Sequence, residues 1–217
     1  MKGLLIKDFK LLKNQKSFLA IVAAVCAFVM IKGSESYALF YGAAMAAMLS
    51  VNSIGYDEEN NGMGFLFTLP VSRRDYVLEK YGFGLLLLGI VLAAGSVLSA
   101  GISAVQEQPM EAVEWAVMLI GPLVTSAAMQ SFMIPVQLKF GTAKGRTALL
   151  VVFLLVVGIS YGAVKMAEIL HIDYAEIMQT IEQAGDAAVV TGLCLLAAAM
   201  MGISCAVSFA IMKKKQF

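Results

Sequence analysis

The residues of this chain that could do chemistry are mainly charged side chains gathered in one stretch, residues 57–80. The stretch offers Asp57, Glu58, Glu59, Leu69, Pro70, Ser72, Arg73, Arg74 and Asp75. Pro70 ends one element and Ser72 can cap the next, with Asp75 at the spacing of a capping box, so we expect a helix from Arg73. Apolar residues with charges around them are typical of an interface, and we predict that this stretch docks a partner. Solvated charges at a helix start are the simpler alternative.

The usual catalytic and nucleotide-binding patterns do not occur. The glycine-rich run at residues 141–145 lacks the spacing of a phosphate-binding P-loop. His171 is the only histidine and has no partner at metal-ligand spacing. Cys26, Cys194 and Cys205 all lie in apolar runs and are expected to be buried as small hydrophobic residues. The sequence therefore predicts no catalytic residue, metal or cofactor in this chain.

A second set of polar residues lies within an apolar run, residues 113–138. Ser126, Gln130 and Gln137 are four and seven residues apart, so they share one helical face with Met133. Polar residues in a membrane helix most often bond neighbouring helices together. A substrate path along this face is the alternative, and the sequence leaves both readings open.

A third set lies at the N-terminus, residues 2–16. Leu5, Phe9 and Leu12 fall on one face of a helix, and Lys7 and Lys10 fall on the opposite face. This spacing predicts an amphipathic interfacial helix on the membrane surface. A basic flank that only orients the chain is the alternative.

The composition indicates what kind of structural element positions these residues. Of 217 residues, 60% are hydrophobic and 14% are charged, the formal net charge is +1, and the mean hydropathy is +0.82. A soluble fold of this size cannot bury so much apolar surface, whereas a bilayer solvates it. This balance excludes a disordered chain, a nucleic-acid-binding arm and an ordinary soluble enzyme. We predict an all-α integral membrane protein with a single transmembrane domain, residues 1–217.

Six apolar runs are candidates for spanning helices, each of which needs about 20 residues. The predicted spans are about 17–34, 37–56, 81–105, 113–138, 147–167 and 187–212. The apolar centre of the first, residues 18–31, is short, so it forms either a re-entrant segment or a span that the lysines at its ends extend by snorkelling, and we favour the span. The stretch 57–80 forms the long inside loop, and residues 173–183 are predicted as a short amphipathic outer helix.

The charges indicate the topology. Six spans place both termini on one side, and that side then holds 14 of the 16 basic residues, whereas nine of the 15 acidic residues lie outside. This split is typical of the positive-inside rule, so we predict cytoplasmic termini. The inside basic residues are Lys2, Lys7, Lys10, Lys13, Lys16, Arg73, Arg74, Lys80, Lys139, Lys144, Arg146, Lys213, Lys214 and Lys215. The span centres contain no charged residue, which disfavours a proton-coupled carrier.

Two segments resemble the ABC-2 type permease subunits of Gram-positive bacteria. The first is Lys2-Gly-Leu-Leu-Ile-Lys-Asp8-Phe9, and the second is Tyr56-Asp57-Glu58-Glu59-Asn60 followed by residues 69–81. The six-span layout is similar to that family over the full length. Within it, the closest resemblance is to permeases of exporters for amphipathic toxin peptides, the phenol-soluble modulins.

The resemblance implies an ATP-driven exporter in the bacterial plasma membrane. Two permeases, either two copies of this chain or this chain and a paralogue, pair with two P-loop ATPase subunits, which bind the ATP and Mg²⁺. Residues 57–80 would supply the coupling helix between spans 2 and 3. The expected substrate is amphipathic or hydrophobic, with peptide the best guess, and membrane lipid is a further expected partner while nucleic acid is not. A stand-alone carrier or channel, and a non-transporting sensor or assembly protein, are the alternatives.

Overall fold

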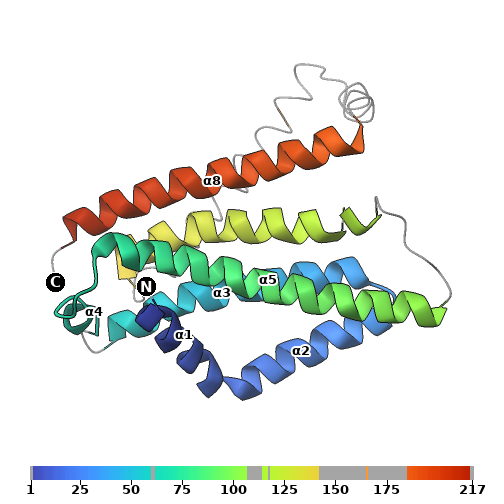
Figure 1. Ribbon diagram of the computed structural model, residues 1–217, viewed down its shortest axis with the longest axis horizontal. Coiled ribbons are helices and arrows are strands. Elements are labelled where there is room, and N and C mark those ends of the chain that lie inside the picture. Colours follow the sequence, from blue (N-terminus) through green and yellow to red (C-terminus); the bar gives the residue numbers. More distant parts are fainter. Residues whose placement is uncertain are drawn as a thin grey trace.

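The computed structural model describes residues 2–59, 62–106, 114–116, 118–141, 165 and 185–215, and all regular structure in these ranges is helical. Four long helices lie roughly alongside one another (Figure 1). They are α3 (Glu35–Glu58), α5 (Arg73–Gln106), the helix over Glu114–Gly141, called helix 114–141 below, and α8 (Asp186–Lys214). Two shorter helices, α1 (Lys2–Asn14) and α2 (Lys16–Ile31), meet at a bend of 76°, and α4 (Gly62–Leu66) lies between α3 and α5.

The four long helices are long and apolar enough to cross a membrane, and a fifth span is present if α1 and α2 count as one bent span. The prediction of an all-helical, multi-pass membrane protein is therefore confirmed for the described residues, whereas only four or five of the six predicted spans are found there. The predicted span 17–34 corresponds to α2. The predicted span 147–167, apart from Lys165, and the outer helix 173–183 lie outside the described residues.

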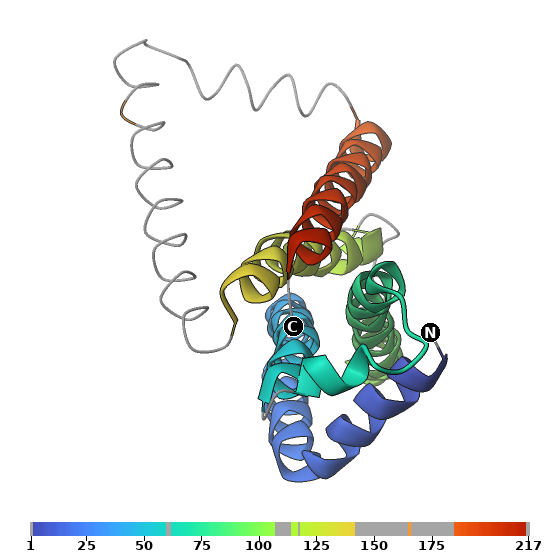
Figure 2. The same cartoon turned by 90° about the vertical axis from the view of Figure 1, so that its left-hand side faces the viewer.

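Both chain ends lie at the same end of the bundle as α4 (Figure 1), and Figure 2 shows this end facing the viewer. At this end, hydrogen bonds join α5 to the end of α8, and Lys215, just after α8, to helix 114–141. The Arg73 guanidinium donates to the Met212 carbonyl oxygen at 2.7 Å, and the Lys215 ammonium donates to the Leu138 carbonyl oxygen at 3.0 Å. We call this the basic end, because the lysines and arginines near both termini gather here. By the positive-inside rule, this end is predicted to face the cytoplasm.

The centre of the bundle is α3. In its most apolar stretch 61% of the residues are buried, against 17% in α8. Small residues allow this close packing, since a side chain at Gly42 would come within 2.8 Å of Val91 on α5. In contrast, α8 leaves Leu195 and Ile203 exposed, and Cys194, which was expected to be buried, is exposed as well. The described helices therefore pack around α3 and α5, with α8 at their edge.

Candidate functional site

The connection between α3 and α5 is shorter than the predicted 57–80 stretch. It covers residues 59–72, because α3 continues to Glu58 and α5 begins at Arg73. Ser72 caps α5 as expected, since its hydroxyl oxygen accepts the Asp75 backbone N–H at 3.0 Å. From Arg73 the same helix continues to Gln106, so one uninterrupted element joins the connection to the far side of the bundle.

A buried ion-pair cluster, defined as Lys7, Asp8, Asp57, Glu79 and Lys80, lies at the base of this connection. The Lys80 ammonium lies 2.5 Å from an Asp8 oxygen, 2.9 Å from an Asp57 oxygen and 3.6 Å from a Glu79 oxygen. Lys7 also pairs with Asp57 and lies 3.2 Å from Asp8. Asp8 and Lys80 are fully buried. Because buried charges are tolerated only when they are paired, the cluster holds α1, α3 and α5 in one arrangement.

Hydrogen bonds to tyrosine and serine hydroxyls complete the cluster. The Tyr76 hydroxyl donates to Asp57 at 3.0 Å, and Lys80 also donates to the Ser53 hydroxyl oxygen at 2.9 Å. The Ser50 hydroxyl in turn donates to the backbone carbonyl of Lys80 at 2.9 Å. Such connected bonds in a low-dielectric interior strengthen one another. Movement of α5 relative to α3 at this point would have to break several of them together.

Glu79 is the least satisfied member of the cluster. It is only 2% exposed, and neither carboxylate oxygen has a hydrogen-bond partner among the described residues. Three carboxyl groups in the cluster share two ammonium groups. Glu79 therefore lacks the short ion pairs and hydrogen bonds that stabilise Asp8 and Asp57.

We predict that Glu79→Gln leaves the stability of the protein unchanged or raises it by up to about 1 kcal/mol, because it removes a poorly satisfied buried charge at nearly constant shape. The measurement is the unfolding midpoint in mixed detergent micelles, with Asp57→Asn as the comparison variant, which we expect to be destabilised. A loss of stability in Glu79→Gln as large as in Asp57→Asn would show that the Glu79 charge is needed.

Most of the residues predicted to dock a partner fall into two groups. Glu59, Leu69, Pro70 and Ser72 are exposed on the connection, and Arg74 is exposed on the first turn of α5. The buried or engaged group contains Asp57, whose carboxylate points into the cluster, Glu58, which pairs with Lys215 at 2.8 Å, and Arg73, which caps the last carbonyls of α8. Asp75 is half-buried at the start of α5. The oxygens of Asp57 are bound inside the bundle, so its contact with a partner stays a prediction.

Exposed apolar side chains lie beside the first group. On α4, Met63 and Leu66 are buried in the core, whereas Phe65 on the same helix is 71% exposed. Leu69 follows at 49% exposed. Gly62 allows the chain to pass close to the end of α3, since a side chain there would come within 2.8 Å of the Asp57 carbonyl oxygen. Phe65 and Leu69 are thus exposed on a firmly anchored connection, with Arg74 exposed at the start of α5.

The N-terminal helix directs its predicted apolar face toward the bundle. Leu5 and Leu12 pack against a core cluster of Ala46, Leu49, Phe83 and Leu87. The Phe9 ring packs edge-to-face on Phe83, with ring centroids 5.5 Å apart. Lys10 is exposed as predicted, but Lys7 turns to the ion-pair cluster instead of the solvent. Sequence reasoning missed Asp8, although its position four residues from both Leu4 and Leu12 places an acid within the apolar stripe.

The polar face of helix 114–141 also points into the bundle. Ser126 and Gln130 are fully buried, Gln137 is nearly so, and Met133 packs against the core around Ile134. The Gln130 amide donates to the Ser126 hydroxyl oxygen at 3.1 Å. This packing supports the interpretation as a helix–helix contact, and the substrate path stays a prediction.

A second polar contact joins three helices nearby. The Ser204 hydroxyl of α8 donates to the Ser131 carbonyl oxygen at 2.6 Å, and the Tyr81 hydroxyl lies 2.5 Å from Ser204 and 3.0 Å from Ser208. The three helices are α5, helix 114–141 and α8. Hydrogen bonds of this kind stabilise helix association in a membrane.

The Gln130 side chain packs against α5 at Gly84. A methyl group at Gly84 would lie 2.1 Å from Gln130 Oε1, whereas one at Gly82 would meet nothing within 4 Å. We predict that Gly84→Ala lowers the unfolding free energy by about 1–3 kcal/mol through overpacking. Gly82→Ala is the matched control and should be neutral or stabilising, since alanine favours helix. Equal midpoints for the two variants in a thermal unfolding assay would contradict this close contact.

Among the described residues, no group of three or more side chains could hold a metal ion.

Comparison with known proteins identifies the family. The family model for ABC-2 family transporter proteins matches residues 3–213, nearly the whole chain. No curated relative matches the chain, so the assignment rests on this family model. The match agrees with the apolar helices and indicates a multi-pass membrane protein, which in bacteria lies in the plasma membrane. This chain belongs to the ABC-2 family of transporter proteins.

Proposed function

We propose that the chain is the permease subunit of an ATP-driven exporter and that the exposed connection between α3 and α5 docks a separate nucleotide-binding subunit. The main support for this proposal is that the connection is held firmly at its ends and yet exposes apolar side chains. The ion-pair cluster fixes the ends of the connection, while Phe65, Leu69 and Arg74 remain exposed. A surface that receives a mechanical input needs both properties, since a loosely attached loop would absorb the movement of its partner.

The geometry supports a route by which such an input reaches the membrane. A partner that pushes on the connection moves the start of α5, and α5 is one helix from Arg73 to Gln106. The bonds of Lys80 to Asp8 and Asp57 carry the same displacement to α1 and α3. We propose that closure of the ATPase subunits moves these three helices together. ATP binding and hydrolysis, with Mg²⁺, take place on the partner.

The proposed assembly contains two ATPase subunits and two permeases, the second being another copy of this chain or a paralogue. The proposed substrate is an amphipathic peptide, which suits a weakly polar path with adaptable methionine side chains. Lipids and hydrophobic drugs are the competing substrate classes. Because Ser126 is buried and Gln130 is buried against α5, they line such a path only if helix 114–141 separates from its neighbours during transport.

The decisive experiment is an ATPase assay on the complex reconstituted in proteoliposomes, with amphipathic peptides, lipids and drugs compared as substrates. We expect the permease to co-purify with the ATPase and peptides to stimulate hydrolysis. Hydrolysis stimulated equally well without the permease would contradict the proposed function. Stimulation by lipids or drugs alone would retain the exporter and change its substrate.

One observation favours a second function, a stand-alone proton-coupled carrier. The ion-pair cluster contains buried carboxylates on helices that enter the membrane, and proton-coupled carriers use such groups. In that case uptake or efflux by the chain alone would follow an imposed pH gradient in liposomes. ATP-dependent transport that persists without a pH gradient would exclude this alternative.

A further inference from the structure

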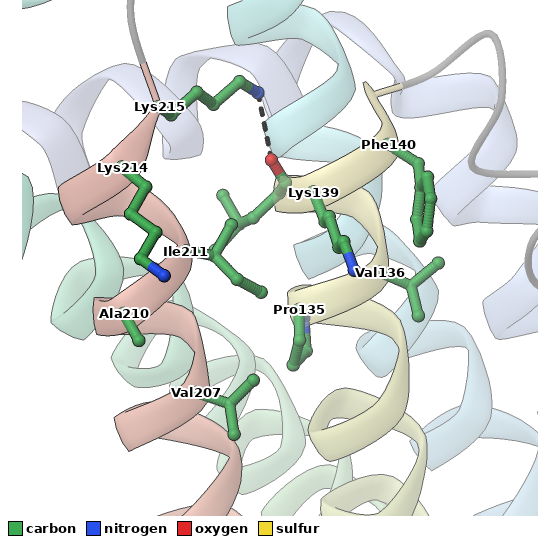
Figure 3. A pocket seen from close by; sticks show the side chains of 10 residues that line it. Pro135, Val136, Lys139, Phe140, Val207, Ala210, Ile211, Lys214 and Lys215 are labelled. Carbon is green, nitrogen blue, oxygen red and sulfur yellow. Dashed lines mark hydrogen bonds between the residues drawn. The ribbon is translucent and has the colours of Figure 1, made fainter.

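A groove with a volume of about 660 Å³ opens at the basic end between helix 114–141 and α8. Figure 3 shows its two walls, one from each helix, with apolar side chains along the groove and lysines at its end. Its lining includes Val136, Lys139, Val207, Ala210, Lys214 and Lys215. The buried polar face with Ser126 and Gln130 contributes nothing to this lining, so the groove is distinct from the contact with α5.

Two of the three lysines have no acidic partner in the described part of the chain. Lys215 is held by the Leu138 carbonyl oxygen and by Glu58. Lys139 and Lys214 are exposed, on opposite walls of the groove (Figure 3), and no described carboxylate lies within ion-pair distance of either. The Lys139 ammonium instead lies 5.2 Å from the centroid of the Phe140 ring. The groove therefore combines an apolar floor with uncompensated positive charge at its mouth.

We propose that this groove binds an anionic phospholipid of the cytoplasmic leaflet. The lipid phosphate would lie between Lys139 and Lys214, and an acyl chain would lie along Val136, Val207 and Ala210. Basic pockets between membrane helices on the cytoplasmic side are typical binding sites for acidic headgroups. Charge complementarity selects this occupant, because an uncharged protein surface would leave both ammonium groups unpaired. The proposal uses the orientation of the basic end and is independent of docking by an ATPase.

The test uses the full-length protein purified in detergent and native mass spectrometry with added lipids. The probes are phosphatidylglycerol, phosphatidylcholine of the same acyl chains, and glycerol 3-phosphate as the free headgroup. One variant, Lys139→Gln with Lys214→Gln, removes the charge. Its control, Lys13→Gln with Lys213→Gln, removes the same charge from residues that do not line the groove. A second variant, Ala210→Trp, fills the groove, and Ile203→Trp on the same helix places the same bulk outside it.

We expect phosphatidylglycerol to bind more tightly than phosphatidylcholine, with glycerol 3-phosphate not retained. The double glutamine variant should weaken phosphatidylglycerol roughly tenfold to thirtyfold, as expected for about 1 kcal/mol per lysine. Ala210→Trp should weaken it to a similar extent, whereas both controls should bind like the parent protein. Binding that survives Ala210→Trp would overturn the groove as the site, and equal binding of both lipids would overturn the role of charge. Failure of every lipid to bind would overturn the lipid proposal and leave a partner protein as the occupant of the groove.

Discussion

Replacing Lys80 with methionine should lower the unfolding free energy by about 3–5 kcal/mol, the largest effect of any single substitution that we predict. The ammonium group is fully buried and bonds to Asp8, Asp57 and Ser53. Methionine fills a similar volume but leaves the carboxylates facing one another in a low-dielectric interior. Equilibrium unfolding in mixed micelles of a mild detergent and dodecyl sulfate measures the loss.

Two further variants separate the ion pair from general disruption. Lys10→Met, on the exposed side of α1, is the matched control and should unfold like the parent protein. The double variant Asp8→Asn with Lys80→Met should be less destabilised than the sum of the two single variants, by about 1–3 kcal/mol of coupling. Additive losses, or a Lys80→Met midpoint equal to that of Lys10→Met, would show that the cluster does not hold α1 against α5.

The second large effect concerns the exposed connection. We expect the double variant Phe65→Glu with Leu69→Glu to abolish co-purification with the ATPase subunit and the substrate-stimulated part of ATP hydrolysis. Aromatic and aliphatic side chains that become buried on binding carry about 2 kcal/mol or more each, so each substitution should cost roughly thirtyfold in affinity and the pair roughly a thousandfold. Both side chains point away from the core, and the fold should tolerate the change.

The control for this prediction is Phe140→Glu. Phe140 is an exposed aromatic residue at the same end of the bundle, 44% exposed, but it belongs to helix 114–141 and not to the connection. It should retain complex formation. Unchanged unfolding midpoints must accompany the loss of binding in the double variant. Retention of the complex by a folded Phe65→Glu, Leu69→Glu protein would place the docking surface elsewhere.

Several features followed from the sequence because they depend on local or compositional physics. The apolar runs predicted membrane helices, since a spanning helix must satisfy its own backbone hydrogen bonds whatever its neighbours are. Ser72 predicted the start of α5 because a cap is made within a few residues. The helix expected from Arg73 likewise runs on into the third span. Charges interrupt the apolar pattern of residues 73–80, and these charges are satisfied only in the tertiary structure.

The tertiary structure alone decided what the charged residues do. Asp8, Asp57 and Lys80 lie 72 positions apart at most, and nothing in their local spacing shows that they meet. Lys7 and Asp57 look like solvated surface charges in the sequence, yet both turn to the cluster because three helices converge there. The lysines of the groove likewise line one site only because the ends of two helices pack together. The sequence by itself thus determined a membrane bundle with a basic end. Long-range packing decided which of its charges are structural and which remain free to bind, because ion pairing depends on distances that only the folded chain sets.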